Sequence, residues 1–239
     1  MNNHTTQKPL FTLPFLILAI LFIVCLIVAN LVEIKTVSIG SVTVTAGLAA
    51  FPLSYIINDC LVEIYGFRKA RLVIWLGFAM SLLTATMLNI AIWLPGGEDW
   101  QSQNAMEEIY GSVPRIMFAS FAAFICGSMV NAYVMSRMKR AAVNPKSSAT
   151  WNFSLRAIIS TLWGEGVDSV IFFPIAFLGT LPTTTILTLI ISQALLKTGY
   201  EILILPITIS VVKRLKRIEG EDTIDSASTN YSWWRMTDL

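Results

Sequence analysis

Charged side chains that interrupt long apolar stretches are the residues of this sequence best suited to do chemistry. The charged residues in question are Asp59, Glu63, Glu165, Asp168, Lys197 and Glu201. An ionised group at the centre of a membrane helix costs about 2.5 to 3.5 kcal/mol, so six that faced lipid would cost roughly 15 to 21 kcal/mol. Because this exceeds the stability of a typical folded protein, about 5 to 15 kcal/mol, we expect these side chains to face a bundle interior or a water-filled cavity.

The spacing of these residues favours a shared polar site. Within each apolar stretch the two charged residues are three or four positions apart, which places them on one helix face. Five carboxylates against one lysine would leave a strong negative charge, so we expect protonation, a bound ligand, or pairing with helix-end bases such as Lys35, Arg71 and Arg156. Gly164 and Gly166 lie beside the carboxylates of their stretch, and glycines within a span allow close backbone approach or helix unwinding.

Structural roles are the alternative for some of these residues. Glu63 could form an interfacial ion pair with Arg68 or Arg71, and Lys197 could pair with Glu201 within one helix. The carboxylates of the glycine-flanked stretch are the least compatible with a purely structural role.

The composition determines the class of protein that carries these residues. The sequence is 55% hydrophobic and 13% charged, with a mean hydropathy of +0.67, whereas a soluble domain carries about 25% charged residues. A net charge of +2 gives no reason to expect a nucleic-acid partner. His4 is the only histidine, the cysteines lie in apolar stretches, and no glycine-rich nucleotide motif is present, so we expect no metal and no cofactor.

The apolar stretches predict an all-α integral membrane protein with six transmembrane helices. These spans are predicted over 11–32, 46–64, 72–94, 116–135, 157–179 and 185–212. Residues 36–45 alternate β-branched side chains around Gly40 and Ser41, which predicts a short hairpin or re-entrant segment.

The distribution of basic residues orients these spans. Lys and Arg gather in three segments, near 68–71, 137–156 and 213–217. The polar segment 95–114 contains acidic residues and no Lys or Arg, so the positive-inside rule places this segment outside and the basic segments in the cytoplasm. Both termini are then predicted to be cytoplasmic, with tails over 1–10 and 213–239 around a transmembrane domain over 11–212. The second tail is expected to be disordered or to lie on the membrane surface.

Short acidic and aromatic motifs follow one another in a characteristic order between residues 10 and 213. They are Asn30 with Lys35, Phe51-Pro52-Leu53 before Asp59, Glu63-Ile64-Tyr65-Gly66 with Ala70-Arg71, Ser160-Thr161-Leu162-Trp163-Gly164 before Asp168, Phe172-Phe173-Pro174-Ile175-Ala176-Phe177, and Lys197 with Glu201 before Pro206. In these motifs the sequence resembles the queuosine precursor transporter family, also called the vitamin uptake transporter family.

The resemblance implies a transporter, not an enzyme, that imports 7-cyano-7-deazaguanine and 7-aminomethyl-7-deazaguanine across a bacterial inner membrane. A carboxylate can accept both the N1–H and the N2 amine of such a base. We expect Asp168 and Glu165 to make this contact, Lys197 or Asn58 to donate to O6, and Glu201 to complete the site.

Further candidate residues come from the same motifs. Asp59 is expected to be a second acidic contact or a gate, and Phe51, Tyr55 and Trp163 are candidates for stacking on the planar base. A gate or structural role is expected for the remaining polar residues of the motifs: Asn30, Lys35, Glu63 and Arg71.

Three alternatives stay open. The chain could be the substrate-binding subunit of an uptake system driven by partner ATPases. An intramembrane aspartyl protease is disfavoured because Asp59 follows Asn58 instead of tyrosine and Asp168 lacks a Gly-x-Gly-Asp sequence. A channel is disfavoured because no filter-like pattern is present.

The expected partners are a small deazapurine and the lipid bilayer. Ion coupling and oligomeric state stay open, with a homodimer as one alternative.

Overall fold

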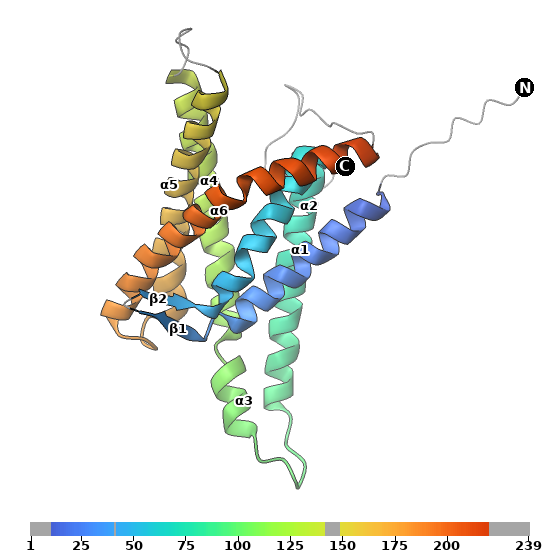
Figure 1. Cartoon of the computed structure of the whole chain (residues 1–239). Coiled ribbons are helices and arrows are strands. Elements are labelled where there is room, and N and C mark those ends of the chain that lie inside the picture. The colour runs from blue at the N-terminus through green and yellow to red at the C-terminus, as the bar shows by residue number, and fades with distance from the viewer. Residues whose placement is uncertain (1–10, 41, 142–148, 220–239) are drawn as a thin grey trace, which may run out of the picture.

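The computed structural model describes residues 11–40, 42–141 and 149–219, which are mostly helical. In chain order the elements are α1 (Leu13–Val32), β1 (Thr36–Ile39), β2 (Val42–Thr45), the 3₁₀ turn η1 (Ala46–Ala49), α2 (Phe51–Trp93), α3 (Gln103–Tyr110), α4 (Val113–Ala141), α5 (Ala149–Phe177) and α6 (Thr183–Glu219) (Figure 1). Five helical stretches of these residues are long and apolar enough to cross a membrane. They correspond to the first predicted span and to the third through sixth.

Helix α2 is divided into two limbs by Gly66. The backbone there has φ 79° and ψ 166°, a conformation that glycine adopts without the steric cost of a side chain. The predicted second span, 46–64, is occupied by η1 and the first limb, 51–65, and neither is among the five membrane-length stretches. The count of six spans and the cytoplasmic placement of both termini therefore stay predictions.

The predicted hairpin at 36–45 is confirmed. Strands β1 and β2 pair antiparallel, with Thr36 opposite Thr45, and Gly40 has a positive φ of 62° beside the connection. The hairpin is attached to α6, because the Ser192 hydroxyl donates to the Thr43 carbonyl oxygen at 2.7 Å. Residue 41 lies outside the described part of the chain.

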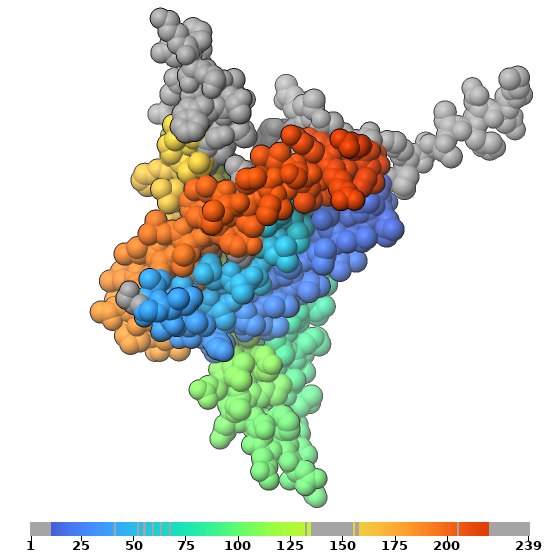
Figure 2. All heavy atoms as spheres, viewed as in Figure 1, coloured from blue at the N-terminus to red at the C-terminus, as the bar shows by residue number. Residues whose placement is uncertain are grey.

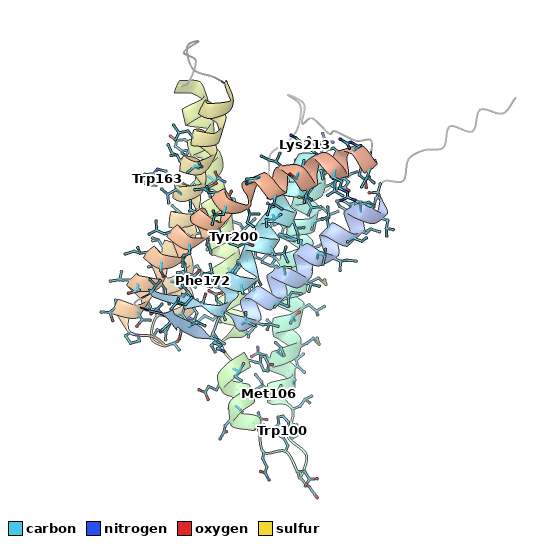
Figure 3. The ribbon with its side chains drawn as sticks, in the orientation of Figure 1. Trp100, Met106, Trp163, Phe172, Tyr200 and Lys213 are labelled. Carbon is cyan, nitrogen blue, oxygen red and sulfur yellow. The ribbon has the colours of Figure 1, made fainter. Side chains whose placement is uncertain are left out.

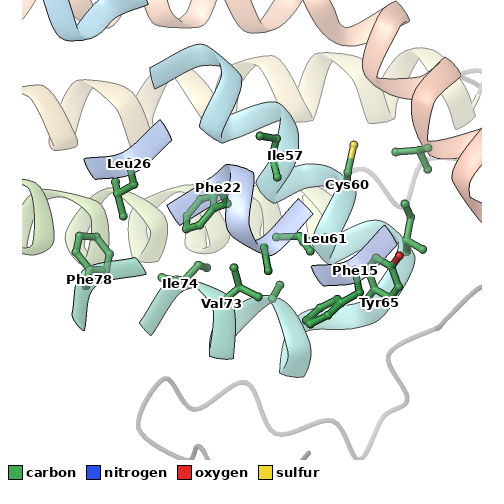
Figure 4. Close-up of a cluster of buried hydrophobic side chains, with 14 of the residues drawn as sticks. Phe15, Phe22, Leu26, Ile57, Cys60, Leu61, Tyr65, Val73, Ile74 and Phe78 are labelled. Carbon is green, nitrogen blue, oxygen red and sulfur yellow. The ribbon is translucent and has the colours of Figure 1, made fainter. Parts of the chain in front are cut away.

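The apolar core is divided between two groups of helices. The first core packs α1 against both limbs of α2 and includes Phe15, Leu61 and Tyr65 (Figure 4). The Phe15 and Tyr65 rings meet edge to face with their centroids 5.0 Å apart. The second core joins α4, α5 and α6 and includes Phe173 and Leu189. The two groups also pack directly on each other, since Val212 of α6 belongs to the first core and the Phe78 ring of α2 lies 4.9 Å from the Phe121 ring of α4, centroid to centroid.

Helices α4 and α5 approach each other closely at two glycines. A Cβ added to Gly127 would lie 2.9 Å from the Gly164 carbonyl oxygen, and a Cβ added to Gly164 would lie 2.9 Å from the Asn131 Cβ. Small residues permit such an approach between membrane helices. The close approach expected from the glycines of this stretch is thus found at Gly164, while α5 remains helical through it.

The ends of the helices differ in detail from the predicted boundaries. The predicted polar segment 95–114 contains α3, which projects with the C-terminal end of α2 beyond the hairpin (Figures 1 and 2). Arg115 donates to the Ile175 and Leu178 carbonyl oxygens, which satisfies acceptors at the C-terminal end of α5. Helix α6 continues to Glu219, past the predicted end of the last span at residue 212.

Candidate functional site

Lys197 on α6 lies between two carboxylates of α5. Its Nζ is 2.9 Å from Asp168 Oδ2 and 3.3 Å from Glu165 Oε2. The exposed fractions of these side chains are 8% for Lys197, 14% for Asp168 and 11% for Glu165. We call these three residues the lysine cluster. The structure thus brings together three of the charged residues that the sequence predicted to share a polar site, two from the fifth predicted span and one from the sixth.

The packing of α4 against α5 fixes the position of Asp168. The Cβ of Asp168 lies 3.1 Å from the place that a Cβ at Gly127 would occupy. A larger residue at Gly127 would therefore push directly on the turn of α5 that carries Asp168. The absence of a side chain at Gly127 therefore leaves room for the turn of α5 that carries Asp168.

The lysine cluster borders a narrow cavity between the two groups of helices. Aromatic rings from α1, α2, α4 and α5 form much of its wall: Phe22, Phe51, Phe78, Phe124, Phe172 and Phe173. The Nζ of Lys197 lies 5.1 Å from the centroid of the Phe51 ring, a cation–π distance. The cavity has a volume of about 20 Å³, room for about one water molecule. The cavity must therefore enlarge before it can hold a purine-sized base.

Glu33 adds a carboxylate to this cavity that the sequence analysis missed. It follows the last residue of α1, is 2% exposed, and lines the cavity together with Asp168 and Lys197. The Thr45 hydroxyl donates to Glu33 Oε1 at 2.6 Å, and the Gln193 amide donates to the Thr45 hydroxyl oxygen. Hydropathy places Glu33 just past an apolar run, where it resembles an ordinary interfacial acid. The predicted hairpin at 36–45, which buries Glu33, was the only sequence feature that could have identified this residue.

The other predicted contacts on α5 and α6 lie apart from the cavity wall. Thr161 donates to Glu201 Oε1 at 3.2 Å across the contact between the two helices. Trp163 is 60% exposed, and Figure 3 shows its ring on the outer side of α5. Trp163 therefore does not line the cavity, and its predicted stacking on the base stays a prediction.

The predicted contacts on α2 are only partly described. Phe51 and Asn58 lie on the first limb of α2 and both line the cavity. The side chains of Tyr55, Asp59 and Glu63 lie outside the described part of the structure, although their backbone belongs to the same limb. Their predicted roles in binding or gating stay predictions.

The predicted gate or structural residues occupy different environments. Asn30 is fully buried and donates to the Leu26 carbonyl oxygen at 2.9 Å, so it stabilises the end of α1. Arg71 is 2% exposed on the second limb of α2. Lys35 is exposed at the start of the hairpin, and its carbonyl oxygen accepts from the Ala46 amide at 2.8 Å. None of these three lines the cavity.

Comparison with known proteins gives a consistent set of relatives. The model of the family described as "Putative vitamin uptake transporter" matches residues 45–211. A "Probable queuosine precursor transporter" of Bacillus subtilis (strain 168) is 34% identical over 192 residues, which cover 80% of this chain and 81% of the relative. The "Queuosine precursor transporter" of Escherichia coli (strain K12) is 30% identical over 141 residues, 59% of this chain and 58% of the relative. No solved structure matches this chain.

Proposed function

Because this chain belongs to the vitamin uptake transporter family, we propose that it imports queuosine precursors, specifically 7-cyano-7-deazaguanine and 7-aminomethyl-7-deazaguanine. Its family and its membrane-spanning helices make it a multi-pass protein of the bacterial inner membrane. The observation that carries the proposal is the lysine cluster at the edge of an aromatic cavity between two groups of helices.

The chemistry of the cavity suits a guanine-like base. A base of this kind presents O6 as an acceptor beside N1–H and the N2 amine as donors. Lys197 supplies a cation for O6, and the carboxylates of the cavity supply acceptors for the two donors. The phenylalanine rings offer flat apolar surfaces for the two faces of the base. The aminomethyl precursor also carries an ammonium group, which the acidic excess of the lysine cluster would attract.

Transport then follows from relative movement of the two groups of helices. The cavity lies where these groups meet, and its present volume is too small for a base. Separation on one side of the membrane would admit the base, and separation on the other side would release it. Buried charges that meet at such a boundary are typical of transporter binding sites.

A complementation experiment tests the proposal. The chain is expressed in a bacterium that cannot synthesise either precursor and lacks its own importer, and queuosine is then measured in its tRNA after supply of each precursor. We expect restoration by the wild-type chain and by Glu98→Gln, a control at an exposed carboxylate. We expect loss with Asp168→Asn at an equal amount of protein in the membrane. Failure of the wild-type chain with both precursors would refute the function, and full activity of Asp168→Asn would refute the site.

A further inference from the structure

Glu33 has a buried carboxylate oxygen that the fold leaves without a partner. The side chain is 2% exposed and lines the cavity, yet its Oε2 has no hydrogen-bond partner within the described part of the chain. No lysine or arginine of the described residues forms an ion pair with it. An unsatisfied polar atom in such a place is costly, so a native example calls for an explanation such as a ligand.

A chain of side chains fixes the other oxygen of Glu33. The Nε2 group of the Gln193 side chain can only donate, and it donates to the Thr45 hydroxyl oxygen. The single hydrogen of that hydroxyl is therefore directed to Glu33 Oε1, at 2.6 Å. Both helix α6 and the hairpin thus hold the carboxylate in one orientation, as expected for a preorganised binding group.

The backbone beside Glu33 is also shaped to this carboxylate. A Cβ added to Gly47 would lie 1.7 Å from Glu33 Oε2 and 2.9 Å from its Cδ. No side chain larger than hydrogen can therefore stand at position 47 while Glu33 keeps its place. The free oxygen lies against the 3₁₀ turn that closes this part of the wall.

Glu33 differs from the carboxylates of the lysine cluster in its ion pairing, although Glu165 Oε2 also has no hydrogen-bond partner among the described residues. Asp168 and Glu165 both approach Lys197, so an ammonium already offsets their charge. Glu33 Oε2 receives no hydrogen bond from the described residues and Oε1 receives one, so both oxygens can accept from a new donor. A pair of adjacent N–H groups on a ligand would complete this set, and the Watson–Crick edge of a guanine-like base presents such a pair.

We propose that Glu33, rather than Asp168, accepts the N1–H and N2 amine hydrogens of the transported base, and that Thr45 is its positioning residue. This assignment rests on the proposed function and specifies which carboxylate gives the site its preference for the 2-amino group. Lys197, in the wall of the same cavity, then donates to O6.

The test compares binding of 7-cyano-7-deazaguanine with that of its analogue lacking the 2-amino group, 7-cyano-7-deazahypoxanthine. Affinities are measured on the purified full chain by titration calorimetry. In the wild-type chain we expect loss of the amine to weaken binding about 10- to 100-fold, as for a hydrogen bond to a charged group. In Glu33→Gln we expect the ratio of the two affinities to fall to about threefold or less, because the carboxamide presents one acceptor where the carboxylate presents two. In Asp168→Asn the ratio is expected to persist even if both affinities fall.

Variants at Gly47 and Thr45 separate this role from a general structural one. Gly47→Ala keeps the charge of Glu33 but displaces its carboxylate, so we expect the same loss of discrimination in correctly folded protein. Thr45→Val removes the donor to Glu33 Oε1 and should reduce the ratio, whereas Thr45→Ser keeps the hydroxyl and should restore it. Glu98→Gln serves as the control with an unchanged ratio.

The possible results separate a failure of the Glu33 assignment from a failure of the proposed function. A wild-type ratio that persists in Glu33→Gln but disappears in Asp168→Asn overturns the assignment and leaves the proposed function intact. A wild-type chain that binds neither compound overturns the proposed function and this assignment with it.

Discussion

Replacement of Lys197 by methionine removes the only cation of the lysine cluster and leaves two carboxylates facing each other. Lys197 is 8% exposed, and its Nζ contacts Asp168 and Glu165 at 2.9 and 3.3 Å. Removal of one partner from a buried ion pair costs about 3 to 5 kcal/mol, because the remaining charge is buried without compensation. For a chain of this size the loss corresponds to a melting temperature lower by roughly 6 to 20 °C.

The assay is thermal unfolding of the purified protein in detergent, followed by tryptophan fluorescence. Lys213→Met is the matched control, because Lys213 is exposed on the same helix (Figure 3). The triple variant that adds Asp168→Asn and Glu165→Gln to Lys197→Met removes the uncompensated charges and should regain part of the lost stability. Equal melting temperatures for the wild-type chain and Lys197→Met, or a triple variant no more stable than the single one, would refute this view of the cluster.

Three further predictions follow from the packing of α5. Gly127→Val should lower both the melting temperature and uptake, because its Cβ would press on the Gly164 carbonyl oxygen and the Asp168 Cβ at 2.9 and 3.1 Å. Gly166→Ala, whose Cβ meets no atom within 4 Å, should be neutral or stabilising by up to about 1 kcal/mol. A wild-type melting temperature and uptake in Gly127→Val would contradict the close packing. Arg115→Ala should lower the melting temperature by about 1 to 3 °C, because two carbonyl oxygens at the end of α5 lose their donor. An unchanged unfolding curve would show that this contact contributes nothing to stability. Trp163→Ala should retain wild-type substrate affinity in the binding assay, because its ring faces away from the cavity, and a tenfold weaker affinity would return this residue to the site.

The sequence predicts most of the membrane helices because lipid selects for apolar length. Five predicted spans correspond to helical stretches of the structure for this reason. The first limb of α2 is different, since Asp59 and Glu63 interrupt it and Gly66 ends it. Hydropathy recognises an apolar segment there but contains no information on whether the chain crosses the membrane or turns back.

The charged centre of the site could be predicted because burial of charge is expensive. That cost predicts that Lys197 meets buried carboxylates, and the packing of the helices decides that these are Asp168 and Glu165. The orientation of aromatic residues is not constrained in this way, because lipid and a protein interior are similarly apolar. The ring of Trp163 is exposed and lies outside the cavity wall, and only the packing of α5 shows this; its role in binding stays a prediction.

Glu33 escaped prediction because its environment is created by distant residues. Thr45 lies on the far strand of the hairpin, and Gln193 lies on the last helix. The predicted hairpin lies close by in the sequence, but its pattern does not indicate that Thr45 and Gln193 will enclose residue 33. Long-range hydrogen bonds of this kind become visible only once the hairpin has been placed against α6.

A structure of the full chain with 7-cyano-7-deazaguanine tests the central claim most directly. The account predicts that the base lies in the cavity between the two groups of helices, with O6 within hydrogen-bond distance of Lys197 Nζ and both N1 and N2 within hydrogen-bond distance of the Glu33 carboxylate. It also predicts a cavity larger than the present 20 Å³. A base bound elsewhere on the protein, with the lysine cluster closed and Glu33 still enclosed by Thr45 and Gly47, would contradict the account.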